Sequence, residues 1–177
     1  MEIEVVRIGQ RVVRDDRVTT HVALVSRAFG ASKIYMNEIN PEIKETLQKI
    51  NDTWGGEFEV KFENNLKEIV KKRKSESYKI IHLTMYGENI DNLKNELEKE
   101  DKIVIIVGAE KVPREFYHLA DYNIAVGNQP HSEISALAIT LDRINKGKQF
   151  QNSFANAKRR IIPSKQGKNV IVNKKRD

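Results

Sequence analysis

Runs of β-branched residues alternate along this chain with stretches in which apolar residues recur at helical spacing. The runs predict strands over residues 2–8, 32–36, 57–62, 78–85, 102–107 and 122–126. The remaining stretches predict helices. The first is capped by Thr19 or Thr20 and ends at Gly30, and the second begins at Asn40-Pro41 and ends before Gly55. Three more are predicted over residues 66–73, 90–99 and 132–144. Strands that alternate with helices of this length favour an α/β fold, a mainly parallel sheet with helices on both faces.

The last part of the chain departs from this alternation and is strongly basic. Two short apolar runs, 160–162 and 169–172, flank a basic segment over 163–168, a pattern that predicts a β-hairpin. Residues 146–177 hold ten basic residues and one acidic residue, so they carry a net charge of +9. Because the net charge of the whole chain is +6, the other residues sum to −3. We therefore predict a domain over 1–146 and a basic extension over 147–177. This charge asymmetry fits a polyanion-binding surface and a solvated tail about equally well.

Composition narrows the classes of function. The chain has no cysteine, which excludes disulfides, thiolate catalysis and cysteine metal sites and suits a reducing cytoplasm. The apolar run 103–107 is far shorter than the roughly 20 residues that span a bilayer, and the acidic start lacks the features of a signal peptide. The four histidines are scattered, and the dinucleotide-binding, phosphate-loop and serine-hydrolase motifs are absent. We expect a soluble cytoplasmic protein that binds a ligand or transfers a group without a metal.

Three of the predicted strands end in loops that contain glycine. Gly87 follows the strand 78–85, Gly108 follows 102–107, and Gly127 follows 122–126 and leads into the last helix. A glycine after a strand is most often only part of a turn, but it also lets the backbone approach a ligand closely. Because ligands of parallel sheets bind where the carboxyl ends of the strands meet, three such loops together favour a binding rim.

Several arginines near the first strand are candidates for phosphate contacts. Arg7, Arg11, Arg14 and Arg17 lie near its carboxyl end, and the planar guanidinium group suits phosphate. Pairing with nearby acidic side chains is the alternative that the pattern alone slightly favours. Arg27 lies beside apolar positions of the first helix, where an arginine either extends outward or is held inward to bind an anion.

Three segments resemble the motifs of the SPOUT RNA methyltransferases, and specifically of the archaeal tRNA (cytidine-56) 2′-O-methyltransferases. Residues 14–31 resemble the first motif, residues 107–113 the second and residues 126–138 the third. In the first motif, Arg27 matches an arginine that lies near the reacting ribose. The resemblance covers nearly the whole chain. It implies a homodimer, a deep trefoil knot in the C-terminal part of the sheet, and a site for S-adenosylmethionine (SAM) inside the knot.

The resemblance also implies roles for individual residues. The implied cofactor-binding residues are Leu83, Gly108, Ala109, Glu110, Lys111, Val112, Val126, Gly127, Asn128, Gln129, Pro130, His131, Ser132 and Glu133. The implied catalytic residues are Arg27, which would hold the target phosphate and polarise the ribose hydroxyl, and His21, which, or a water, would take the proton. The phosphates of a tRNA would be bound by Arg7, Arg11, Arg14, Arg17, Lys158, Arg159, Arg160, Lys165 and Lys168.

The function that the resemblance implies is SAM-dependent methylation of a tRNA ribose 2′-hydroxyl, at cytidine 56 of the TΨC loop. Three alternatives stay open at this point: a SPOUT methyltransferase that acts on another RNA nucleotide, a non-catalytic RNA-binding module of the same fold, and a nucleotide-binding α/β regulator. A binding module need not retain Gly108, Glu110, Gly127, Asn128 and Arg27 together, and this chain has all of them. A regulator leaves the basic tail unexplained.

Overall fold

Six parallel strands form the centre of the structure, a computed structural model that describes residues 1–9, 16–37, 40–109 and 111–173. The strands of the sheet are β1 (Glu2–Ile8), β2 (Lys33–Met36), β3 (Glu59–Phe62), β4 (Lys79–Asn89), β5 (Lys102–Gly108) and β6 (Tyr122–Ala125). The helices are α1 (Asp16–Ala28), α2 (Glu42–Trp54), α3 (Leu66–Ser75), α4 (Ile90–Leu97), α5 (Arg114–Leu119), α6 (Glu133–Asn145) and the 3-10 helix η1 (Lys148–Gln151). The strand order is β3-β2-β1-β5-β4-β6, and neighbouring strands pair in parallel.

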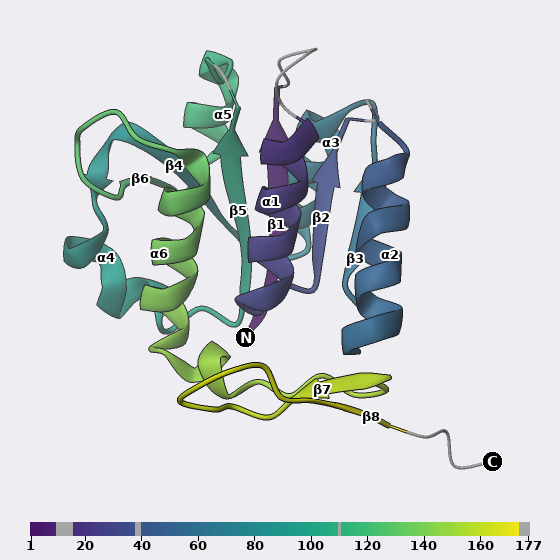
Figure 1. Ribbon diagram of the computed structural model, residues 1–177. Coiled ribbons are helices and arrows are strands. Elements are labelled where there is room, and N and C mark those ends of the chain that lie inside the picture. Colours follow the sequence, from purple (N-terminus) through teal and green to yellow (C-terminus); the bar gives the residue numbers. More distant parts are fainter. Residues whose placement is uncertain (10–15, 38–39, 110, 174–177) are drawn as a thin grey trace.

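Helices cover both faces of this sheet (Figure 1). On one face, α1, α2, α4 and α6 bury residues such as Val22, Leu47 and Leu137 in one apolar cluster. On the other face, α3 and α5 bury Val70 and Phe116 in a second cluster. Because both faces are covered, the central strand β5 is buried along nearly its whole length, which explains its uninterrupted apolar sequence. The predicted α/β fold with a mainly parallel sheet is confirmed.

Some elements differ from the prediction for simple reasons. α1 begins at Asp16, so Thr19 is a buried residue inside the helix and not its cap. The sequence pattern does not predict α5 and η1, because helices of six and four residues are too short to show a helical period. The predicted opening of α2 is close to the observed one: Asn40 Oδ1 accepts the Glu42 N–H at 2.9 Å, and Pro41 has helical backbone angles.

β4 contacts β6 in two registers, and this crossing shapes one end of the sheet. Leu83 pairs with Ile124, and after a shift Glu88 pairs with the same Ile124. Gly87 lies in the shifted segment, where an added Cβ would stand 2.5 Å from the Asn123 carbonyl carbon and oxygen. The sequence pattern indicated that backbone approaches a ligand at Gly87. In the structure, the group that approaches Gly87 is the backbone of β6.

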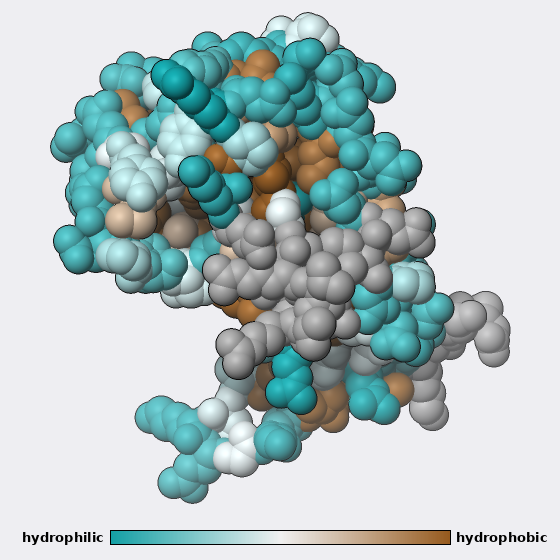
Figure 2. Space-filling view, turned by 90° about the horizontal axis from the view of Figure 1, so that it is seen from above, coloured by the Kyte–Doolittle hydropathy of each residue, from teal (hydrophilic) through white to brown (hydrophobic). Residues whose placement is uncertain are grey.

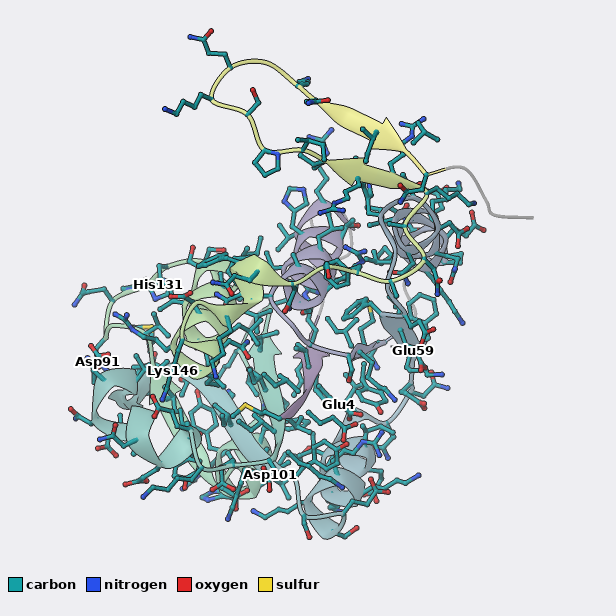
Figure 3. All side chains as sticks on the ribbon, turned by 90° about the horizontal axis from the view of Figure 1, so that it is seen from below. Glu4, Glu59, Asp91, Asp101, His131 and Lys146 are labelled. Atoms are coloured by element: carbon teal, nitrogen blue, oxygen red, sulfur yellow. The ribbon has the colours of Figure 1, made fainter. Side chains whose placement is uncertain are left out.

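The tail lies at the end of the sheet opposite the carboxyl ends of the strands (Figure 1). β7 (Arg159–Ile161) and β8 (Val170–Val172) pair antiparallel and form a separate two-stranded sheet. Seen from below, this sheet projects from the body, with side chains extending from it into open space (Figure 3). The tail is attached to the body at Gly56, whose N–H donates to Ala155 O at 2.9 Å and whose Cα lies against the Phe154 ring. In the described part of the chain, none of the helices has the length and apolar character needed to cross a membrane.

Candidate active site

A cleft of about 1200 Å³ opens where the carboxyl ends of β4, β5 and β6 meet. Its apolar walls come from Val18, Leu83, Val107, Ile124 and Val126. Figure 2 looks onto this end of the molecule and shows hydrophobic side chains in the middle of a face whose margin is hydrophilic. Pockets for a single small ligand usually measure about 300–1,000 Å³. The cleft therefore has room for a cofactor and for part of a second molecule.

Most of the residues predicted to bind a cofactor line this cleft. They are Leu83 after β4; Gly108, Ala109, Lys111 and Val112 after β5; and Val126, Gly127, Gln129, Pro130, His131, Ser132 and Glu133 between β6 and α6. Asn128 is not among the lining residues, and Glu110 lies outside the described residues. The fold thus brings together three segments that are far apart in the sequence, as a binding rim requires.

Local hydrogen bonds shape the loop that leads into α6. Gly127 has a φ of +74°, a left-handed value that glycine adopts without strain. His131 Nε2 donates to Val126 O at 2.6 Å across the turn. Ser132 caps α6 by accepting the Ile134 N–H at 3.1 Å. The amino end of α6 is therefore presented to the cleft, where its partial positive charge favours an anionic group.

Asn128 joins two of the loops to each other. Its Nδ2 donates to Met85 O at 2.8 Å and to Gly87 O at 3.1 Å. The resemblance implied a direct contact of Asn128 with the cofactor. In the structure, its amide fixes the loop after β4 to the loop after β6, and so holds the rim in shape.

A network of polar side chains, which no sequence pattern predicts, forms the α5 side of the cleft. Asn123 Nδ2 donates to Tyr117 O at 2.9 Å, so its Oδ1 accepts from Nδ1 of the buried His82 at 2.9 Å. The Tyr117 ring packs edge-on to His82, with ring centroids 4.4 Å apart, and its hydroxyl lies 3.2 Å from Thr84 Oγ1. Burial lowers the pKa of His82, which keeps its ring neutral near pH 7. These partners come from β4, β6 and the unpredicted α5, so no local pattern marks them.

Acidification is expected to destabilise the protein through His82. The pKa of an unfolded histidine is about 6.5, and burial lowers the pKa of His82 below that value. As the pH falls, His82 is therefore protonated in the unfolded chain before it is protonated in the folded chain. The stability that comes from keeping this histidine neutral is complete above about pH 6.5 and is lost as the pH falls through the folded pKa. Within that window the free energy of unfolding should fall by up to about 1.4 kcal/mol per pH unit.

Urea unfolding at a series of pH values measures this slope. His82→Gln cannot titrate and should remove it, whereas His118→Gln, at an exposed histidine of the same cleft, should keep it. If the free energy of unfolding of His82→Gln still falls with pH in this window, a group other than His82 causes the pH dependence.

Arg7 lies beneath the cleft and not on the surface. Its side chain is 1% exposed, its Nη1 donates to Gly9 O at 3.3 Å, and its Nη2 lies 3.6 Å from Glu133 Oε1. A phosphate cannot reach a side chain that is covered in this way, so the predicted RNA contact of Arg7 is corrected. Its charge instead balances that of Glu133 in the cleft wall.

Arg27 and His21 are not brought to the cleft within one chain. Arg27 is in the last turn of α1, near the end of the sheet that carries the tail, and is buried. Its Nε donates to Asn51 Oδ1 at 2.8 Å, its Nη2 donates to Gly55 O, and its guanidinium carbon lies 4.4 Å from the centre of the Phe154 ring. Burial lowers the pKa of Arg27. His21 is exposed on α1, and neither residue is among the described residues that line the cleft.

The other predicted RNA contacts lie at two ends of the molecule. Arg17 is exposed at the start of α1, next to Val18 of the cleft wall. The basic residues of the tail, Lys158, Arg159, Arg160, Lys165 and Lys168, are exposed at the opposite end of the sheet. Arg11 and Arg14 lie outside the described residues. Across residues 1–9, 16–37, 40–109 and 111–173, no group of three or more histidine, aspartate or glutamate side chains is placed to hold a metal ion.

Several solved structures of methyltransferases share this fold. The TrmH/SpoU tRNA modifying enzyme of A. aeolicus matches with a TM-score of 0.60 and 14% identity, over 85% of this chain and 76% of that chain. The SpoU methyltransferase AviRb from Streptomyces viridochromogenes, solved in complex with the cofactor AdoMet, matches with a TM-score of 0.55 and 8% identity, over 82% of this chain and 57% of that chain. At these identities the likeness defines the fold class alone, that of the SpoU-type methyltransferases.

Sequence comparison defines the family within that class. A family model described as tRNA ribose 2′-O-methyltransferase, aTrm56, matches residues 54–171. The tRNA (cytidine(56)-2′-O)-methyltransferase of Nitrosopumilus maritimus is 68% identical to this chain over the full length of both proteins. The chain belongs to the aTrm56 family of tRNA ribose 2′-O-methyltransferases, and the family inferred from its motifs is confirmed.

Proposed function

We propose that this protein transfers the methyl group of SAM to the 2′-hydroxyl of cytidine 56 in tRNA. The observation that carries the proposal is the convergence of the segments after β4, β5 and β6 around one cleft. Two of these segments are the second and third motifs of the family. The relative from Nitrosopumilus maritimus, which shares 68% of its residues with this chain, has the same activity in its name.

The chemistry of the cleft fits SAM, whose sulfonium group supplies an electrophilic methyl. Leu83, Val18 and Val126 offer apolar surface for the purine ring. The amino end of α6 favours the carboxylate of the cofactor. At Gly127 an added Cβ would meet no atom within 4 Å, so the backbone of this turn is open to a ligand.

The space that remains in the cleft suits the nucleotide that receives the methyl group. To react, the ribose hydroxyl must lie in line with the sulfur–methyl bond, and holding two reactants in this way contributes up to about 7–11 kcal/mol to the lowering of a barrier. Asn128, which joins the loop after β4 to the loop after β6, and His131, which closes the turn after β6, would support such a geometry. Arg17, which is exposed and next to Val18 of the cleft wall, would bind a phosphate of the same nucleotide strand.

The proposal includes finer features that the resemblance implies. We propose a trefoil knot in the C-terminal part of the sheet, a homodimer, and action in the cytoplasm without a metal. Residues 1–146 would carry the transfer, and 147–177, with its paired strands β7 and β8, would bind RNA. Arg27 and His21 stay the proposed catalytic residues. Since they lie away from the cleft of their own chain, that role requires a second copy of the chain to bring them to it.

Mapping the methylated nucleotide tests the proposed function. The protein is incubated with labelled SAM and an unmodified tRNA transcript, and the product is digested and analysed. We expect one methyl group, on the ribose of cytidine 56, and no transfer to a transcript with 2′-deoxycytidine at that position. Label on another nucleotide would favour a different RNA target. If the protein binds tRNA tightly but transfers no methyl group, and calorimetry detects no heat when SAM is added, the non-catalytic binding module would be favoured.

Removing positive charge from the tail is expected to weaken tRNA binding but not SAM binding. Lys165→Ala combined with Lys168→Ala changes two exposed cations that lie far from the cleft. The slope of log affinity against log salt should become shallower by about 0.7–0.9 for each phosphate that the tail no longer binds. Lys71→Ala with Lys72→Ala removes the same charge from α3 and serves as the control. If the slope of log affinity against log salt is the same for the tail variant as for the α3 variant, the tail does not bind RNA phosphates.

A further inference from the structure

Tyr86 is an exposed aromatic residue at the mouth of the cleft. Its side chain is 78% exposed, and its neighbour Met85 is 37% exposed. Both line the cleft. An aromatic ring carries a large apolar surface, so at the mouth of a cleft it offers a flat ligand an area on which to pack.

The backbone that carries Tyr86 is held on both sides. Asn128 Nδ2 donates to Met85 O at 2.8 Å and to Gly87 O at 3.1 Å, the carbonyls directly before and after Tyr86. The Tyr86 N–H donates to Thr84 Oγ1 at 3.4 Å, and Thr84 is in turn joined to α5. The ring is therefore presented outward on a fixed turn, which lowers the entropy that a flat ligand loses on binding it.

Cations lie on another part of the same rim. Lys111 and Arg114 line the cleft and are exposed, and neither forms an ion pair with any residue in the described ranges. Proteins recognise an unpaired RNA nucleotide with this combination, an aromatic ring for the base and cations for the phosphates beside it.

We propose that Tyr86 stacks on an RNA base that leaves its helical stack as the target strand enters the cleft. This proposal rests on the proposed function and gives it a nucleotide-holding residue. Extruding a nucleotide disrupts stacking within the RNA, and a new stacking partner in the protein offsets part of that loss. The phosphates next to the extruded nucleotide then lie toward Lys111 and Arg114. Tyr86 acts as a positioning residue, since it takes no part in moving the methyl group or the proton.

Steady-state kinetics of Tyr86 variants tests the proposal on the full-length protein. Tyr86→Ala should lower kcat/KM for the tRNA transcript roughly 5- to 150-fold, the range that one base–aromatic stacking contact corresponds to. The affinity for SAM, measured by calorimetry, should not change. Tyr86→Phe keeps the ring and should restore kcat/KM. Lys71→Ala changes an exposed side chain of α3, outside the cleft and the tail, and should leave kcat/KM unchanged.

A fluorescent cytidine analogue at position 56 gives a second readout. Its emission should be quenched when the wild-type protein or Tyr86→Phe binds, and quenched less with Tyr86→Ala. The proposal is overturned if Tyr86→Ala methylates tRNA as fast as the wild-type protein, if it loses SAM affinity in step with turnover, or if its effect follows a change in oligomeric mass. A wild-type protein that transfers no methyl group to tRNA would instead overturn the proposed function, and this inference with it.

Discussion

Replacing Gly87 with alanine is expected to lower the free energy of unfolding by about 3 kcal/mol or more and to abolish SAM binding. An added Cβ would lie 2.5 Å from the carbonyl carbon and oxygen of Asn123 and 2.6 Å from the carbonyl carbon of Ile124. These atoms belong to the backbone of β6 and cannot rotate away as a side chain can. β4 must therefore separate from β6. The carbonyls of Met85 and Gly87, which accept from Asn128, would move with it and open the rim.

Gly127→Ala is the matched control for this prediction. Gly127 has a φ of +74°, but an added Cβ there would meet no atom within 4 Å. The substitution thus tests backbone strain without a clash, and should cost roughly 1–2 kcal/mol. Urea unfolding gives the stability of both variants, and calorimetry gives their SAM affinity. If Gly87→Ala were as stable as Gly127→Ala, the contact of β4 with β6 would be looser than the structure indicates.

The sheet could be located from the sequence, but its order could not. A parallel strand covered on both faces leaves an uninterrupted apolar run, and the runs over 2–8 and 102–107 fall on β1 and β5. Which strands become neighbours depends on contacts between distant segments. β1 lies between β2 and β5, and nothing in the local pattern near residues 2–8 marks either neighbour.

The position of the cleft could be predicted from the glycines that follow strands, but the polar contacts within it could not. Gly108 and Gly127 do lie at the cleft, because loops at the carboxyl ends of parallel strands converge. Two polar residues at the cleft, however, were missed or misplaced. His82 stands within an apolar run and is buried by Tyr117 and Asn123, and Arg7 is buried beside Glu133. Burial of a charged or polar side chain depends on partners from other elements, so sequence alone does not reveal it.

Replacing Arg27 with alanine is expected to lower the free energy of unfolding by roughly 3 kcal/mol and to loosen the tail. The substitution leaves Asn51 Oδ1 and Gly55 O without their donor, at about 1–3 kcal/mol for each unpaired group. It also removes the cation from the Phe154 ring, a contact worth about 0.5–2 kcal/mol. Because Gly55 and Phe154 belong to the place where the tail meets the body, trypsin should cleave residues 158–168 faster in this variant. Urea unfolding and timed proteolysis measure the two effects.

Phe154→Ala separates anchoring of the tail from catalysis by Arg27. It removes the aromatic partner but leaves the guanidinium and its bonds to Asn51 and Gly55 in place. Turnover is compared in single-turnover reactions at saturating SAM and tRNA, at a temperature where both variants are folded. A slower transfer in Arg27→Ala than in Phe154→Ala would show that the arginine acts on the reaction, which requires it to reach the cleft of a second chain. Equal rates would restrict Arg27 to the anchoring contact, because both variants loosen the tail and only Arg27→Ala removes the guanidinium group.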